Sequence, residues 1–188
     1  MPGERNDSFK RQFMMHYPAT AVVILFLVLS GFCHASSTYS YLLAEPLPQA
    51  DRVVVNKGVR TLKLMKQGEV IKSYQISLGR QPFGHKQREG DYRTPEGTYL
   101  IDWRNPTSLY HLSLHISYPG TQDRGKAERG GYSPGGAIMI HGRPVFIGSN
   151  DILFNSRDWT DGCIAVTNAE IEEIWRAVPD GTPIIILP

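Results

Sequence analysis

The chain has 188 residues, which is enough for one domain with an appendage and for a hydrophobic core that needs neither disulfides nor a metal. Its 20 Lys and Arg against 18 Asp and Glu give a formal net charge of +2 at pH 7. A charge this small, scattered along the chain without a basic run between aromatics, argues against nucleic acid as a partner.

The first 35 residues are predicted to be a signal peptide or an N-terminal membrane anchor. Basic residues precede an apolar run from Ala19 to Phe32, and the sequence "CHA" that follows resembles an A-x-A cleavage site ending at Ala35. An uncleaved run would instead anchor the chain through residues 19–32, although the run is short for a membrane span. Both interpretations predict an exported protein of the periplasm or cell envelope.

Residues 36–50 are expected to form a linker, because small polar residues and two prolines show no sustained period. One domain is expected over residues 51–188. It begins with the β-rich stretches "DRVVVNKG" and "RTLKLMKQGEVIKSYQISLG", and the second predicts a hairpin that turns at "KQGE". Residues 80–97 are rich in glycine and charge and are predicted to be a loop.

Three further strands are predicted in "TYLIDW", "YHLSLHISY" and "AIMIH". In the middle strand, alternation separates His111 and His115 from the apolar residues, and an exposed sheet face is favoured for both over a place in a cleft. The apolar face of that strand is formed by Leu112, Leu114 and Ile116. Residues 123–136 are predicted to be a mobile surface loop that could lie over a site.

A helix is predicted after Cys163, because Thr167 and Glu170 form a capping box before an apolar face. That face is formed by Ile171, Ile174, Trp175 and Val178. The sequence "PDGT" ends the helix, and "PIIIL" is predicted to be a short buried strand. The fold class is therefore mainly β: a sandwich or barrel of mixed, mostly antiparallel strands with one helix packed against it.

Cysteine is scarce in this chain. Cys33 lies in the segment predicted to be removed, so Cys163 would be the only cysteine of the exported domain. A single thiol in an oxidising compartment is either functional or a small buried hydrophobe. A cysteine nucleophile needs a base, and His141 at the end of an apolar strand is the natural candidate. Gly162 permits the tight backbone approach that suits an oxyanion site.

The motifs "GDYRTPEGTYLI", "IMIHG" and "DGCIAV" occur in this order along the chain. Together they resemble the YkuD-type L,D-transpeptidases, whose pattern has HG, a spacer and then S-H-G-C-[IV]-R, over residues 51–188. The resemblance implies a β-rich catalytic domain with Cys163 as nucleophile and His141 as base. It also implies peptidoglycan stem peptides as substrate and no cofactor.

The resemblance further implies acyl transfer, in which the Cys163 thiolate attacks the carbonyl of the third stem residue, expels D-alanine and forms a thioester. An amine acceptor then produces a cross-link, whereas water makes the protein an L,D-carboxypeptidase or another peptidoglycan hydrolase. The sequence leaves both outcomes open, along with the oligomeric state.

Two positions depart from the family pattern: Asp161 stands where the motif has histidine, and Ala165 stands where it has arginine. An unpaired Asp161 would raise the pKa of the thiol. The favoured hypothesis is a hydrogen bond between Asp161 and His141, which would give a Cys-His-Asp arrangement. The missing arginine leaves the group that binds the substrate carboxylate unassigned among three candidates: Arg143, Arg157 and Arg93.

Two other classes of function stay open. A metal site could use His141, Asp161 and Cys163 with His115 or His85 as a fourth ligand, although no CxxC or HxxxH spacing is present. A cell-wall-binding module that has lost turnover would also fit the two departures, because activity needs the whole constellation. The sequence favours an enzyme without a metal over both.

Overall fold

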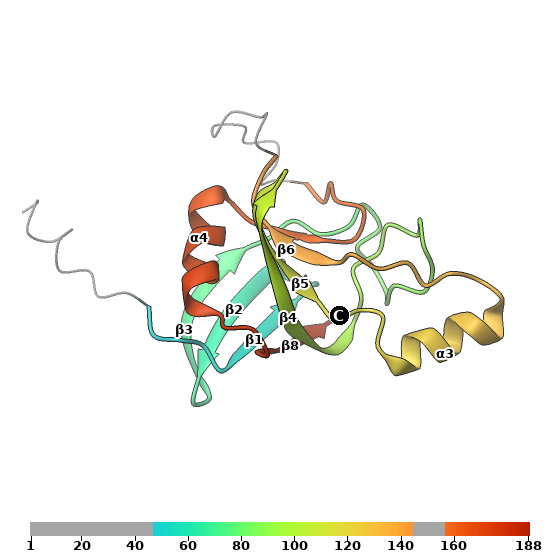
Figure 1. Ribbon diagram of the computed structural model, residues 1–188, viewed down its shortest axis with the longest axis horizontal. Coiled ribbons are helices and arrows are strands. Elements are labelled where there is room, and N and C mark those ends of the chain that lie inside the picture. The colour runs from blue at the N-terminus through green and yellow to red at the C-terminus, as the bar shows by residue number, and fades with distance from the viewer. Residues whose placement is uncertain (1–46, 145–156) are drawn as a thin grey trace, which may run out of the picture. The chain divides into compact units, whose positions relative to one another are not determined.

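The computed structural model describes residues 47–144 and 157–188, and these belong to one compact unit, Leu47–Pro188 (Figure 1). The predicted signal peptide or anchor and most of the predicted linker lie outside the described residues. None of the helices within the described ranges is long and apolar enough to cross a membrane.

A mixed sheet of eight strands forms the centre of the described chain, in the order β3-β2-β1-β8-β4-β5-β6-β7. The pairs β1–β8 and β6–β7 are parallel, and all other neighbours are antiparallel. The strands are β1 (Arg52–Asn56), β2 (Thr61–Lys66), β3 (Glu69–Gln75), β4 (Gly97–Ser108), β5 (His111–Ile116), β6 (Met139–His141), β7 (Ile164–Ala165) and β8 (Pro183–Leu187). The predicted class, mainly β with mixed and mostly antiparallel strands, is confirmed.

The predicted hairpin is the β2–β3 pair. Its two turn residues, Gln67 and Gly68, have φ values of 51° and 87°, the left-handed conformation that a tight two-residue hairpin turn requires. The long strand β4 connects the two halves of the sheet (Figure 1), because its first residues pair with β8 and its later residues with β5. Two register shifts in the β4–β5 pair bend the strand between these partners.

The helix predicted after Cys163 is α4 (Asn168–Ala177), and its capping box is present. The Glu170 carboxylate accepts a hydrogen bond from the Thr167 backbone N–H at 2.8 Å, and the Thr167 hydroxyl accepts one from the Glu170 N–H at 3.3 Å. Ile171 and Ile174 are fully buried, and the helix contacts β5 and β6. Helix α4 therefore supports the two strands from which the site is built.

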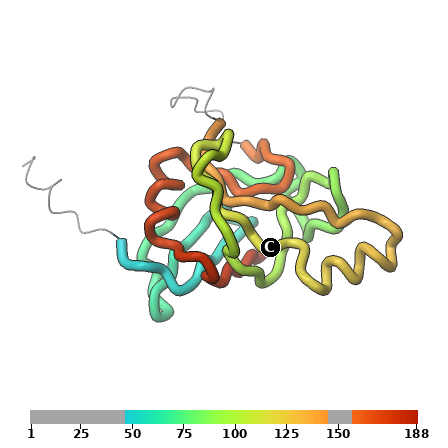
Figure 2. The backbone as a smooth tube through the Cα atoms, viewed as in Figure 1, coloured from blue at the N-terminus to red at the C-terminus, as the bar shows by residue number. Residues whose placement is uncertain are grey.

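The predicted loop over residues 123–136 is wrong in its first part, because Thr121–Gly130 form helix α3, which projects beyond the sheet in Figure 1 and is the yellow coil in Figure 2. The Asp123 carboxylate accepts a hydrogen bond from the Gly120 N–H at 2.8 Å, and Gly131 ends the helix in a left-handed conformation. Asp123 and Ala127 are its only buried residues, so hydrophobic periodicity gave no signal. The described chain thus has two helices where one was predicted.

The loop predicted over residues 80–97 is confirmed up to Gly97, where β4 begins. A buried lysine holds this loop against the sheet: Lys57 Nζ donates to the carbonyls of Gly84 at 2.7 Å and Thr94 at 2.9 Å. It also forms an ion pair with Glu96 at 2.7 Å. Burial lowers the pKa of Lys57, while Glu96 opposes that shift. These contacts hold the loop in place against the sheet.

Candidate active site

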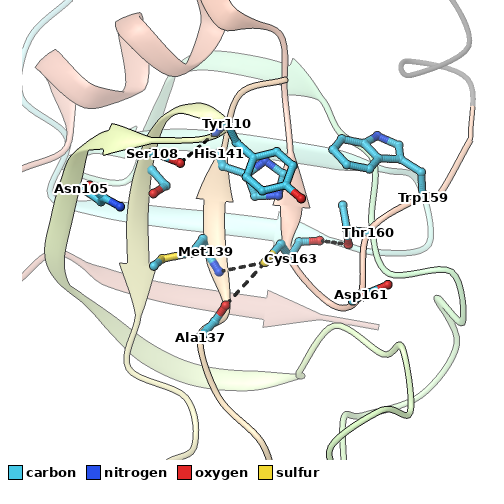
Figure 3. A pocket seen from close by; sticks show the side chains of 11 residues that line it. Asn105, Ser108, Tyr110, Ala137, Met139, His141, Trp159, Thr160, Asp161 and Cys163 are labelled. Atoms are coloured by element: carbon cyan, nitrogen blue, oxygen red, sulfur yellow. Dashed lines mark hydrogen bonds between the residues drawn. The ribbon is translucent and has the colours of Figure 1, made fainter. Parts of the chain in front are cut away.

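A cavity of about 330 Å³ lies where β5, β6 and the segment 159–163 meet (Figure 3). It is lined by Asn105, Ser108, Tyr110, Ser113, Ala137, Met139, His141, Trp159, Thr160, Asp161 and Cys163. The fold thereby brings together three residues predicted from the sequence, namely Cys163, His141 and Asp161. Figure 3 shows the thiol between the beginning of strand β6, at Met139, and the turn at Thr160.

A short turn before β7 fixes Cys163. The Thr160 hydroxyl accepts a hydrogen bond from the Gly162 N–H at 3.1 Å and donates one to the Cys163 carbonyl at 2.7 Å. On the neighbouring strand, the Met139 N–H donates to Cys163 Sγ at 3.4 Å, and the thiol contacts the Ala137 carbonyl at 3.6 Å. The sulfur is therefore held at the cavity wall by backbone groups.

His141 is the last residue of β6 and is only 4% exposed. Its Nδ1 lies 2.6 Å from the Gly142 carbonyl oxygen, which can only accept a hydrogen bond. Nδ1 therefore carries the proton, and Nε2 is left as an acceptor. The rings of Tyr110 and Trp159 lie 4.5 Å and 5.6 Å from the imidazole, centroid to centroid, and shield it from water.

Burial disfavours charge on both reacting groups. It lowers the pKa of His141 from 6.5 to about 4, against the opposing effect of the Gly142 carbonyl. Burial also raises the pKa of the Cys163 thiol; the Met139 N–H opposes this shift and the Asp161 carboxylate adds to it. At neutral pH the two groups therefore rest as a neutral imidazole and a thiol, rather than as an imidazolium–thiolate pair.

The lowered pKa of His141 predicts a loss of stability in mild acid. The unfolded chain binds a proton near pH 6.5, whereas the folded chain does so only near pH 4, so folding is favoured above pH 6.5 and weakened as the pH falls between these values. The loss should reach about 3 kcal/mol. Urea unfolding of the wild type and of His141→Gln at several pH values between 7 and 4 measures it. A difference between the two proteins that does not change with pH would contradict the prediction.

Residues 50–186 match the model of the YkuD family, the L,D-transpeptidase catalytic domain. This chain belongs to that family. The match covers nearly all of the described unit, including both strands of the site and the turn that carries Cys163. It therefore confirms the family that the three ordered motifs indicated.

Known proteins similar to this YkuD domain come from several bacteria. "Putative L,D-transpeptidase YafK" of Escherichia coli (strain K12) is 35% identical over 133 residues, which are 67% of this chain and 46% of that protein. The crystal structure of the helical cell shape determining protein Pgp2 from Campylobacter jejuni is 25% identical with a TM-score of 0.57, over 78% of this chain and 52% of that one.

The structure of Bdellovibrio bacteriovorus Bd1075 shares the fold, at 23% identity and a TM-score of 0.50 over 77% of this chain and 52% of that one. This chain spans less than half the length of the curated relatives that it matches. The YkuD domain is therefore the part that the relatives share with it.

The proposed hydrogen bond between Asp161 and His141 is wrong. The Asp161 carboxylate instead pairs with Arg80, Oδ1 to Nη2 at 2.6 Å, and the acceptor that orients His141 is the Gly142 carbonyl. The side chain of Asp161 is 76% exposed, so it turns toward solvent while the imidazole is buried. An ion pair this exposed contributes no more than about 1 kcal/mol to folding.

The three arginines proposed for the substrate carboxylate do not line the cavity of the YkuD domain. Arg143 is buried at 6% exposure, and its backbone N–H donates to Asn168. Arg157 is exposed, and the Arg93 guanidinium lies 3.5 Å from the His85 carbonyl in the neighbouring loop. Sequence reasoning missed Arg80 as the partner of Asp161, because one arginine in a charged loop carries no signal of a partner 81 residues away. Arg80 does not line the cavity either.

The remaining histidines lie away from the thiol. His111 pairs with Glu172 at 2.7 Å and His115 with Asp102 at 2.6 Å, so neither lines the cavity, as the alternation in β5 suggested. His85 pairs with Asp123 in the first turn of α3. Within residues 47–144 and 157–188, no three His, Cys, Asp or Glu side chains converge in an arrangement that could hold a metal ion.

Proposed function

We propose that this YkuD domain catalyses acyl transfer on peptidoglycan stem peptides through a thioester on Cys163. The observation that carries the proposal is the shared cavity, which Cys163 and His141 line together while the Gly142 carbonyl leaves Nε2 of the imidazole as a proton acceptor. The family supplies the substrate class, since L,D-transpeptidase domains act on stem peptides.

Cys163 and His141 are both uncharged before the substrate binds, so the thiol must lose its proton during the reaction. The Cys163 thiol passes its proton to His141 Nε2 as the sulfur attacks the carbonyl of the third stem residue. The tetrahedral intermediate then expels the amine of D-alanine, which takes the proton back from the imidazolium as the C–N bond breaks. The remaining thioester is attacked by an acceptor amine or by water, which passes a proton to His141 Nε2. The C–S bond then breaks, and the Cys163 sulfur takes that proton from the imidazolium, which restores the neutral pair.

The oxyanion of the tetrahedral intermediate needs hydrogen-bond donors beside the sulfur. The backbone N–H of Cys163 donates to no acceptor in the described part of the chain, whereas the N–H of Gly162 is occupied by the Thr160 hydroxyl. We therefore assign the Cys163 N–H as an oxyanion donor and Gly162 as the residue that shapes the turn.

The proposal includes export, because peptidoglycan lies outside the cytoplasm. The basic and apolar N-terminal residues of the chain are consistent with a signal peptide or anchor over residues 1–35. Their removal or retention decides whether the domain diffuses in the envelope or stays at the membrane.

Incubation of the full-length protein with purified disaccharide-tetrapeptides tests the proposal by the masses of the products. We expect loss of alanine, alone if water is the acceptor and with formation of dimers if a second stem peptide is. The Cys163→Ala variant should give neither product, and a carbapenem should add its mass to the wild type and not to this variant. A wild type that is unmodified and leaves the peptides unchanged would instead indicate a wall-binding module without turnover.

A further inference from the structure

The ion pair of Arg80 and Asp161 lies beside the cavity but takes no part in the chemistry assigned to Cys163 and His141. Its atoms are 2.6 Å apart, and the two side chains are 52% and 76% exposed. Water competes for both charges at such exposure, so the pair adds little to folding. Asp161 lies two residues before the nucleophile, and an ion pair that the fold does not need can exchange its internal contact for contacts with a ligand.

The backbone that carries Arg80 is fixed from two sides. The Arg80 N–H donates to the Thr160 carbonyl at 2.9 Å, and the Thr160 N–H donates to the Leu78 carbonyl at 3.1 Å. The guanidinium carbon of Arg80 lies 4.1 Å from the centroid of the Tyr92 ring. Stacking on this ring limits the rotation of the side chain, so the guanidinium is held ready for a bidentate partner.

The rest of the cavity lining is uncharged. Asp161 is the only carboxylate among the lining residues, no Lys or Arg of the described chain is among them, and the His141 imidazole is neutral at pH 7. Asp161 therefore gives the cavity lining one negative group, and its ion-pair partner Arg80, which is not itself a lining residue, places a positive group next to it. The ligand group that complements them best carries both charges at the same spacing.

We propose that Arg80 and Asp161 together bind the zwitterionic end of a diaminopimelate side chain, in which an ammonium and a carboxylate share one carbon. The proposal rests on the proposed function and names the part of the substrate that the site recognises. Asp161 accepts hydrogen bonds from the ammonium, and the Arg80 guanidinium donates two N–H groups to the carboxylate.

The pairing also gives a physical account of the two departures from the family pattern. Ala165 is 3% exposed and packed in the core, so no arginine could extend from that position without displacing its neighbours. Arg80 supplies a cation from a different part of the chain, and Asp161 supplies the anion that keeps this cation in place when no substrate is bound.

Stem peptides that differ only at the end of the third residue test the proposal in the full-length protein. One has the free zwitterion, one has its carboxylate amidated and one has its amine acetylated. The rate of D-alanine release shows whether the enzyme recognises the zwitterion in the donor peptide, which forms the thioester, because alanine is released whether water or an amine is the acceptor. Formation of dimers from an unmodified donor and an amidated acceptor reports recognition in the acceptor.

We expect the wild type to release D-alanine from the zwitterionic peptide with a kcat/KM at least about tenfold above that for either modified peptide. In Arg80→Gln the preference over the amidated peptide should fall below about threefold, and in Asp161→Asn the preference over the acetylated peptide should fall likewise. If the wild type distinguished the peptides only in the dimer assay, Arg80 and Asp161 would bind the zwitterion of the acceptor peptide and not that of the donor.

Arg88→Gln is the matched control, because Arg88 is exposed and, among the described residues, takes part in hydrogen bonds only through its backbone. It removes the same charge and should keep the full preference for the zwitterion. Equal turnover of all three peptides by the wild type, in both assays, would overturn the proposal while leaving the proposed function intact. No release of alanine from any peptide would show that the proposed function itself fails.

Discussion

Replacing His141 with glutamine should lower the rate at which Cys163 is acylated by a stem peptide by about a thousandfold. The neutral thiol at this site has no other proton acceptor assigned to it, since its neighbours are the Met139 N–H and the Ala137 carbonyl. Glutamine has a similar size and keeps a polar end, but it cannot take up a proton at neutral pH. Single-turnover measurement of the acyl-enzyme by mass gives the rate.

His115→Gln is the control for this variant. His115 pairs with Asp102 and stacks on Trp103, 4.9 Å between centroids, outside the cavity. Its replacement should change the acylation rate by less than about threefold, because it touches neither reacting group. If His141→Gln kept more than a tenth of the wild-type rate, His141 would not be the base.

Alkylation of Cys163 by iodoacetamide shows the protonation state of the resting pair directly. With the pKa of the thiol raised and that of His141 lowered, the alkylation rate should increase with pH through the neutral range without a plateau. A rate that is already constant between pH 5 and 8 would mean an imidazolium–thiolate pair and would contradict the neutral resting state.

Replacing Gly162 with alanine should cost about 3 kcal/mol of folding free energy and most of the activity. Gly162 has a φ of 134°, a conformation that residues with a Cβ rarely adopt. An added Cβ would also lie 2.7 Å from the Arg93 carbonyl oxygen, which is backbone and cannot move aside. Relief of that contact would shift the turn at Thr160 and, with it, the sulfur of Cys163.

Gly131→Ala separates the cost of a positive φ from the cost of the contact with the Arg93 carbonyl. Gly131 has a φ of 68° at the end of α3, and an added Cβ there meets nothing within 4 Å. It should cost only the conformational penalty of about 1 kcal/mol and leave acylation unchanged. Urea unfolding and acylation rates of both variants check the difference. Equal losses of stability in the two would show that the contact with Arg93 is unimportant.

The elements that were predicted correctly are those whose signal lies within a few neighbouring residues. Alternation of apolar residues revealed β5, and the spacing from Thr167 to Glu170 revealed α4, because each pattern is a property of one element. Helix α3 has no apolar stripe, since only two of its residues are buried. Asp123 caps its beginning and Gly131 its end, but aspartate and glycine are also common in ordinary turns, so these residues do not by themselves indicate a helix.

Cys163 and His141 were found for a similar reason: a lone cysteine after a glycine and a histidine at the end of an apolar strand are local features. Their roles in the reaction stay predictions. The partner of Asp161 could not be found in this way. The predicted partner was His141, and no local pattern shows that the folded chain brings Arg80 within hydrogen-bond distance of Asp161 instead.

The sequence by itself determined the class of fold, the family and the two residues proposed to react, because periodicity, caps and ordered motifs are written in contiguous residues. Only the tertiary structure decided the surroundings of those residues. The Gly142 carbonyl orients His141, Tyr110 and Trp159 shield it, and Arg80 reaches Asp161 from 81 residues away. Such contacts depend on strand order and on burial, which arise when distant segments pack together and leave little trace in either segment alone.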